Sequence, residues 1–133
     1  MCSSDLRVIR ECPVIGISCM TPAGEDGLPS PRFVTSAVRQ AAVQAMGDRV
    51  LVIKSALPPG TAAKLQQIAD EALAERADAP RIAMNVVAMP ELFNDGQMVA
   101  AMRRQDPLLV GRADAAAALP VIEIGRASCR ERV

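Results

Sequence analysis

The 133-residue chain carries 15 basic and 15 acidic side chains and no histidine; 50% of its residues are apolar and only 2% are aromatic. This balance offers no basic surface for nucleic acid or anionic membranes, and no apolar run reaches the roughly 20 residues that span a bilayer. Without histidine, the chain cannot contain a Ser-His-Asp triad or a histidine zinc site.

The two ends of the chain, residues 1–6 and 123–133, show neither an apolar period nor a helix cap. "CSSDL" and "EIGRASCRERV" resemble translated sequencing adapters, which are set aside before fold reasoning. We therefore expect residues 7–122 to be the gene-derived part, cut from a longer gene. Of the four cysteines only Cys12 and Cys19 lie inside it, and we expect both to be small buried side chains.

The first predicted strand is the apolar run 14–20, which is followed by the turn-rich loop "AGEDGLPS" with Glu-Asp-Gly as an ordinary turn. Ser30 is expected to cap a helix that has Pro31 at its first position, and Gly47 to end it. The apolar residues of this helix recur at helical spacing: Phe33, Val34, Ala37, Val38, Ala41, Ala42 and Ala45.

The second predicted strand is 49–55, and a helix follows it from about Gly60-Thr61. One apolar stripe runs along this helix. The third strand is predicted at 81–88, a short helix at 95–104 and a weaker strand at 108–110. The helical stripe consists of Leu65, Ile68, Ala69, Ala72 and Leu73.

Strands that alternate with helices in this way predict an α/β fold with a parallel sheet and right-handed crossovers. We expect an incomplete Rossmann-like sheet whose first βα unit is missing, because the sequence contains no GxGxxG. In such sheets ligands bind beyond the carboxyl ends of the strands. The loops "TPAGEDG", "SALPPGT" and "AMPELFNDG" should therefore lie on one rim. The stretch "PPGTAAK" lacks the spacing of a phosphate-binding P-loop.

Three charged residues of these loops are open to two readings. Glu91 and Asp95 are four residues apart, so they could form an acid/base pair, but spacing alone favours solvated loop charges. Lys54 at a strand end could touch an anion, although a solvated lysine is the better reading of the position alone.

The three rim loops together resemble the UDP-glucose/GDP-mannose dehydrogenase family. Its pattern "(V/I)xxxxxTPxxxDGxxD" is similar to residues 14–30, "KSTVPxGT" to "KSALPPGT" at 54–61, and "NPExLxxGxAxxxxxxPDRIVIG" to residues 89–111. The resemblance implies an NAD-binding domain of an enzyme of polysaccharide biosynthesis. Such enzymes oxidise a sugar C6 hydroxyl to a carboxylate in two NAD-dependent hydride transfers, through a cysteine thiohemiacetal and a thioester.

The resemblance also implies roles for individual residues. Thr21 matches the threonine near the cofactor, and Glu91 matches the acid/base glutamate. Three residues, Leu92, Phe93 and Asn94, match the stretch that lines the sugar nucleotide.

Ser55 and Asp95 complete the expected cofactor-binding set. No metal site is implied. The expected partners are a nucleotide sugar and further copies of the parent protein, with no nucleic acid and no membrane. The expected location is the cytoplasm.

Four residues depart from the family pattern. The nucleophilic cysteine of the family belongs to other parts of those enzymes, and neither Cys12 nor Cys19 matches it. We therefore expect the chain alone to be inactive, and we leave the nucleotide sugar open. The departures are Met20 for glycine, Ala56 for threonine, Met89 for asparagine and Pro107 for arginine.

Two other functions share the alternating pattern. A stand-alone α/β nucleotide-binding or receiver-like module would fit it, although the acidic pair and late lysine of a receiver are not found. A β-hydroxyacid or phosphogluconate-type dehydrogenase would also have a Rossmann half, but "PELFNDG" after Pro-Pro-Gly-Thr fits it less well.

Overall fold

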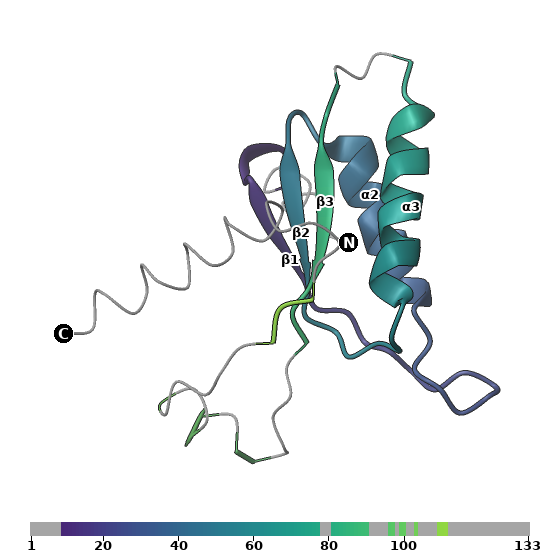
Figure 1. Ribbon diagram of the computed structural model, residues 1–133, viewed down its shortest axis with the longest axis vertical. Coiled ribbons are helices and arrows are strands. Elements are labelled where there is room, and N and C mark those ends of the chain that lie inside the picture. The colour runs from purple at the N-terminus through teal and green to yellow at the C-terminus, as the bar shows by residue number, and fades with distance from the viewer. Residues whose placement is uncertain are drawn as a thin grey trace.

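The computed structural model describes residues 9–77, 81–90, 96–97, 99–100, 103 and 109–111 (Figure 1). Three strands alternate with two helices, in the order β1 (Val14–Ile17), α2 (Arg32–Gln44), β2 (Arg49–Ile53), α3 (Thr61–Ala74) and β3 (Met84–Ala88). A helical turn at 9–11 precedes β1. In the described part of the chain, no helix is long and apolar enough to cross a membrane.

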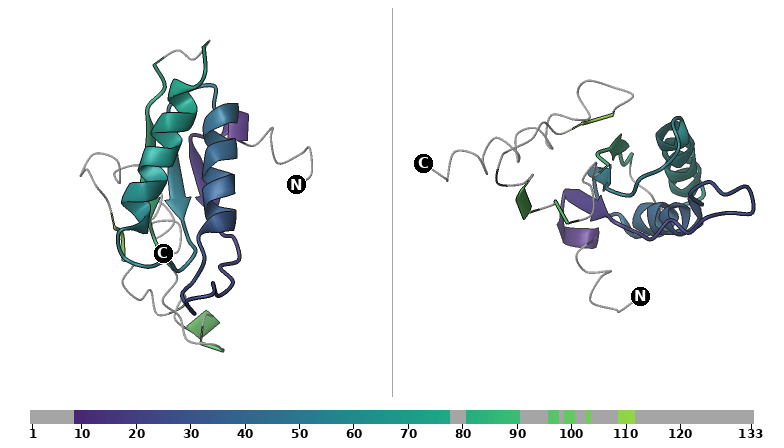
Figure 2. Two further views of the ribbon diagram at one scale, coloured as in Figure 1. Left: turned by 90° about the vertical axis from the view of Figure 1, so that its right-hand side faces the viewer. Right: turned by 90° about the horizontal axis from the view of Figure 1, so that it is seen from below.

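The three strands form one parallel sheet in the order β1-β2-β3, so each strand lies beside the next one in the sequence. Ile15 pairs with Leu51, and Leu51 with Val86. Both helices pack on the same face of the sheet (Figures 1 and 2), because two right-handed crossovers that advance in one direction lie on one side. The α/β prediction is confirmed.

The central strand β2 is buried on both faces, which is why it reads as an unbroken apolar run. Leu51 and Ile53 face the helices and are at most 2% exposed. Val50 and Val52 alternate with them and pack with Val87 on the opposite face. Each such side chain, once fully buried, stabilises the fold by about 1.5–3 kcal/mol.

Helix α2 begins one residue later than predicted. Pro31 is its N-cap, and the first helical hydrogen bond runs from the Thr35 amide to the Pro31 carbonyl at 2.8 Å. The Ser30 prediction is wrong: Pro31 is the N-cap and no side chain caps the helix, while the Ser30 amide donates to the Pro22 carbonyl and closes the preceding loop. Phe33 was expected on the apolar face of this helix, but its side chain is 45% exposed. The Arg32 guanidinium lies 4.5 Å from its ring centroid.

Helix α2 ends at Gln44, earlier than the predicted end at Gly47. The backbone turns to an extended conformation at Ala45. There, the Arg76 guanidinium donates to the carbonyls of Ala42 and Ala45 at 3.1 and 2.7 Å. A side chain from the end of α3 therefore caps this helix, in place of the glycine expected from the sequence.

Helix α3 agrees with its prediction. It begins at Thr61, and its buried side chains are Leu65, Ala69 and Ala72. Ile68 and Leu73 pack at the edge of the same core. The predicted apolar stripe is confirmed.

The observed strands are shorter than predicted. The last backbone bonds between them join Lys54 to Ile17 and Met89 to Ile53, both at 2.8 Å, and the loops separate after these points. At the opposite end, β3 begins at Met84, three residues later than expected.

The strand predicted at 108–110 is wrong for its described residues. Leu109 and Val110 belong to no strand. Gly111 instead forms an isolated antiparallel bridge with Ala88, at the carboxyl end of β3. Of the helix predicted at 95–104, Val99, Ala100 and Arg103 are helical, and most of its other residues lie outside the described residues.

The outer edge of β3 is covered by the side chain of Gln66 from α3. Its amide nitrogen donates to the Met84 carbonyl at 2.7 Å, and its amide oxygen accepts from the Val86 amide at 2.8 Å. The Gln66 side chain thus satisfies one backbone carbonyl and one backbone amide of β3, as a neighbouring strand would. It also blocks an edge that could pair with a second molecule.

Candidate functional site

The carboxyl ends of the three strands meet at one end of the sheet, as they must in a parallel sheet (Figure 1). The segments that follow them begin at Ser18, Lys54 and Met89. This rim is where ligands bind in open α/β folds. The rim predicted from the sequence is confirmed for these described segments.

The loop after β1 folds back on itself. Ala23 and Pro29 form an isolated antiparallel bridge, and the Gly24 amide donates to the Leu28 carbonyl at 2.8 Å. At its tip, an Asp26 carboxylate oxygen accepts from the Leu28 amide at 3.0 Å, and Gly27 has a φ of 76°. The predicted Glu-Asp-Gly turn is confirmed. The loop begins at the half-buried Thr21, the residue expected to lie near a cofactor.

The loop after β2 is tied to the loop after β1 by Ser55. The Ser55 hydroxyl donates to the Cys19 carbonyl at 2.8 Å and accepts from the Cys19 amide at 3.0 Å. Ser55 and Cys19 are both half-buried. The structure therefore brings Ser55 to within two residues of Thr21 along the neighbouring loop.

The Pro-Pro-Gly junction turns the chain from β2 into α3. Gly60 is the N-cap of α3 with a φ of 83°, in the left-handed region that favours glycine. An added Cβ would meet nothing within 4 Å there, so the backbone angle, and not crowding, requires the glycine. The Pro58 carbonyl accepts from the Thr61 hydroxyl at 2.7 Å, which fixes the first helical turn.

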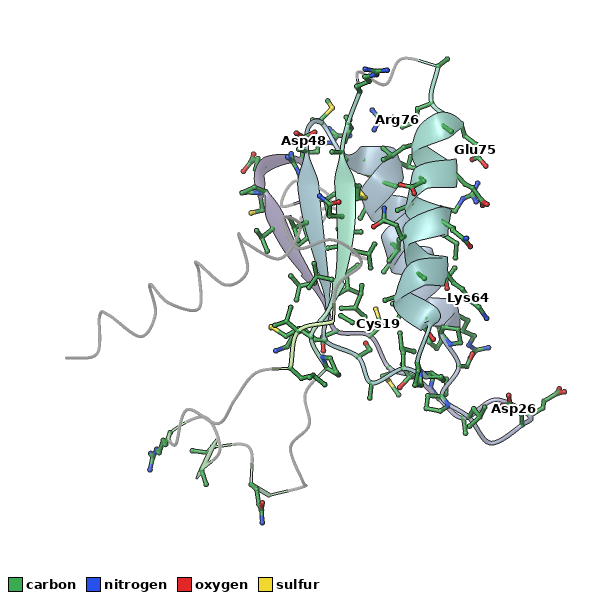
Figure 3. All side chains as sticks on the ribbon, in the orientation of Figure 1. Cys19, Asp26, Asp48, Lys64, Glu75 and Arg76 are labelled. Carbon is green, nitrogen blue, oxygen red and sulfur yellow. The ribbon has the colours of Figure 1, made fainter. Side chains whose placement is uncertain are left out.

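A pocket of about 400 Å³ lies between the β1 loop and the start of α3. Its volume is within the roughly 300–1,000 Å³ of small-molecule sites. Asp26 and Lys64 bring opposite charges to it from the two sides (Figure 3). Its walls are mostly apolar and rich in proline: Leu28, Pro29, Pro31, Pro58, Pro59, Leu65 and Ile68, with Thr35 and Thr61 between them.

The predicted acid/base and substrate-lining residues lie outside the described residues. These residues follow β3 directly after Met89 and Pro90, which are both half-buried. Their places in the site stay predictions. They are Glu91, Leu92, Phe93, Asn94 and Asp95.

The cysteines differ from expectation. Cys12 and Cys19 are free thiols and half-buried, not buried, because both stand just outside the ends of β1. Among the residues that the structure describes, no group of acidic, cysteine or histidine side chains could hold a metal ion.

Sequence reasoning missed the polar side chains that hold the amino end of the sheet. Arg49 donates to the carbonyls of Ile9, Arg10 and Asp48 at 3.2, 2.5 and 2.8 Å. The Asp48 carboxylate accepts from the Ala83 amide at 2.8 Å. No local sequence pattern predicts these hydrogen bonds, because most of the bonded residues are 35 or more positions apart in the sequence.

The chain is similar to known proteins in both sequence and structure. The sequence model described as "UDP-glucose/GDP-mannose dehydrogenase family, NAD binding domain" matches residues 2–127. The UDP-glucose 6-dehydrogenase of Pseudomonas aeruginosa is 32% identical over 106 residues, which are 80% of this chain and 23% of that protein. The corresponding enzyme of Bacillus subtilis is 27% identical over 118 residues, 89% of this chain and 26% of that protein.

Solved structures give the same picture. A UDP-glucose dehydrogenase from the archaeon Pyrobaculum islandicum has a TM-score of 0.76 at 25% identity, covering 95% of this chain and 29% of that one. A GDP-mannose dehydrogenase from Pseudomonas aeruginosa has the same fold, with a TM-score of 0.76 at 16% identity over 91% of this chain and 28% of that one. The chain spans about a quarter of the length of the curated relatives it matches.

Proposed function

The chain belongs to the UDP-glucose/GDP-mannose dehydrogenase family and matches the NAD-binding domain of that family. We therefore propose that its parent protein is a nucleotide-sugar 6-dehydrogenase. The reaction oxidises the C6 hydroxyl of a nucleotide sugar to a carboxylate. Bound NAD supplies the hydride acceptor. The family match across residues 2–127 is the observation that carries this proposal.

The described residues suit one wall of an NAD site. The rim offers the Thr21 hydroxyl and the joined loops at Cys19 and Ser55. The sequence contains no GxGxxG, the motif that holds the pyrophosphate in Rossmann folds. We therefore assign to this chain the wall formed by the strands that follow that motif, with Thr21 facing the cofactor.

The reacting end of the substrate is assigned to the residues that follow β3. Glu91 acts as the acid/base, and Leu92, Phe93 and Asn94 line the sugar nucleotide, with Asp95 on the cofactor side. This assignment rests on the motif "MPELFNDG" and on its position at the carboxyl end of a parallel strand. Neither Cys12 nor Cys19 serves as the nucleophile, so the chain alone turns over no substrate.

UDP-glucose is the first substrate to test, because the curated relatives are UDP-glucose 6-dehydrogenases. The full-length parent should be recovered and assayed for NADH formation with UDP-glucose and GDP-mannose. We expect one of them to support turnover, and Glu91→Gln to abolish it with NAD binding retained. If the parent forms no NADH with either sugar, UDP-glucose and GDP-mannose are excluded as its substrates. A parent gene without GxGxxG and a cysteine motif would contradict the proposal itself.

A further inference from the structure

The Ser55 hydroxyl joins two loops that belong to different strands. It donates to the Cys19 carbonyl at 2.8 Å and accepts from the Cys19 amide at 3.0 Å. Both polar groups of one backbone residue are thus held by one side chain from a segment 36 residues away. Such a pair of bonds fixes the backbone at Cys19 in two directions at once.

The alternation of β1 explains why a side chain is needed at this point. The carbonyls of Pro13 and Ile17 accept from amides of β2 and its extension, at 2.9 and 2.8 Å. Cys19 continues the same alternation, so its amide and carbonyl face the β2 side. By then β2 has ended at Ile53. The Ser55 hydroxyl takes the place of the backbone partner that the strand no longer supplies.

The hydrogen-bonding capacity of serine limits what else Ser55 can do. A hydroxyl has one donor and two acceptor positions. The donor is used by the Cys19 carbonyl and one acceptor position by the Cys19 amide. The Ser55 hydroxyl therefore has no hydrogen left to give to a phosphate or a carboxamide oxygen.

We infer that the Ser55 side chain is a positioning group of the NAD site, which acts through Cys19 on Thr21 and whose hydroxyl does not donate a hydrogen bond to the cofactor. Thr21 is half-buried and follows Cys19 by two residues, with the 80% exposed Met20 between them. Fixing Cys19 therefore determines where Thr21 is presented at the rim. This inference rests on the proposed function, because it concerns the same site.

The test uses the 133-residue chain and three variants. Ser55→Ala removes the hydroxyl, and Ser55→Thr restores it. Ser18→Ala is the matched control, since Ser18 is exposed and lies in the same loop. In the 133-residue chain, NMR hydrogen exchange at the Cys19 amide reports the hydrogen bonds from Ser55. In the full-length parent with the same substitutions, titration with NAD reports the cofactor site, because the parent is expected to supply the GxGxxG that this chain lacks.

We expect the Cys19 amide to exchange about tenfold faster in Ser55→Ala, the effect of losing about one hydrogen bond. NAD affinity should fall severalfold in the same variant. Ser55→Thr should restore both, and Ser18→Ala should change neither.

An unchanged rate of hydrogen exchange at the Cys19 amide in Ser55→Ala would show that the Ser55 hydroxyl does not hold the Cys19 backbone. Faster exchange with unchanged NAD affinity would overturn the positioning role. If the unaltered parent binds no NAD, the proposed function is contradicted, and exchange at Cys19 still decides whether Ser55 holds the loop.

Discussion

The two ends of the sheet are held together in different ways (Figure 3). At the amino end, the charged side chains of Arg49, Asp48 and Arg76 bind backbone groups of other segments. At the carboxyl end, the loops are shaped by a serine hydroxyl, by prolines and by Gly60 at a positive φ. Charge thus stabilises the end away from the candidate site, and small residues shape the end where ligands bind in open α/β folds.

The difference has a physical reason. An arginine presents five donors in a planar fork, so it can bind several carbonyls that strands and helices leave open. At the rim where we propose that NAD and a nucleotide sugar bind, arginines committed to backbone carbonyls would occupy space that these ligands need. Backbone conformation and short hydroxyl contacts leave that space open.

The largest effect is expected for Arg49→Ala. The variant removes the three hydrogen bonds to the carbonyls of Ile9, Arg10 and Asp48. Since bonds from charged donors contribute more than neutral ones, we expect a loss of about 3 kcal/mol in the free energy of unfolding, measured in urea. Arg32→Ala is the control, because that exposed guanidinium lies over the Phe33 ring and not against strand backbone. Equal losses in the two variants would remove the contrast between the ends.

Arg76→Ala should cost about 2 kcal/mol, because it leaves the carbonyls of Ala42 and Ala45 without their guanidinium partner. The loss should appear as faster amide exchange in the last turn of α2. Arg39→Ala breaks the exposed 2.6 Å ion pair with Glu75 on the same two helices, and exposed pairs contribute about 0–1 kcal/mol. A larger loss for Arg39→Ala than for Arg76→Ala would show that the ion pair, and not the cap, joins the helices.

Gly60→Ala should cost about 1 kcal/mol, at the carboxyl end, because alanine disfavours the left-handed backbone found there. Thermal unfolding measures the change. Gly16→Ala is the matched control: its φ is not positive, and an added methyl group meets nothing within 4 Å. If both substitutions are neutral, the junction before α3 can adopt another turn.

The smallest effect is expected for Asp26→Ala, about 0.5 kcal/mol. Its carboxylate accepts one exposed hydrogen bond, from the Leu28 amide at 3.0 Å. Asp26→Asn keeps an acceptor and should behave as the unaltered chain does in urea unfolding. A loss from Asp26→Ala comparable with that of Arg49→Ala would mean that charge stabilises both ends alike.

Local patterns in the sequence were sufficient for the main elements. The spacing of Leu65, Ala69 and Ala72 predicted the buried face of α3, and Gly60-Thr61 predicted its start. The alternation of strands and helices predicted a parallel sheet, and therefore a shared rim for the loops after each strand. These features depend either on neighbours within a few residues or on general rules of chain connection. Both kinds of information are available from the sequence alone.

The errors arose where a distant segment completes the local structure. The end of α2 is set by Arg76, which lies 31 residues beyond Ala45, so Gly47 was the wrong signal. Ser30 does not cap α2, and its amide instead closes a loop with Pro22. The sequence by itself determined the elements, their order and the family motifs on the rim. Tertiary structure decided which polar side chains hold the ends of the sheet, because Arg49, Ser55, Gln66 and Arg76 meet their partners only after the crossovers place distant segments side by side.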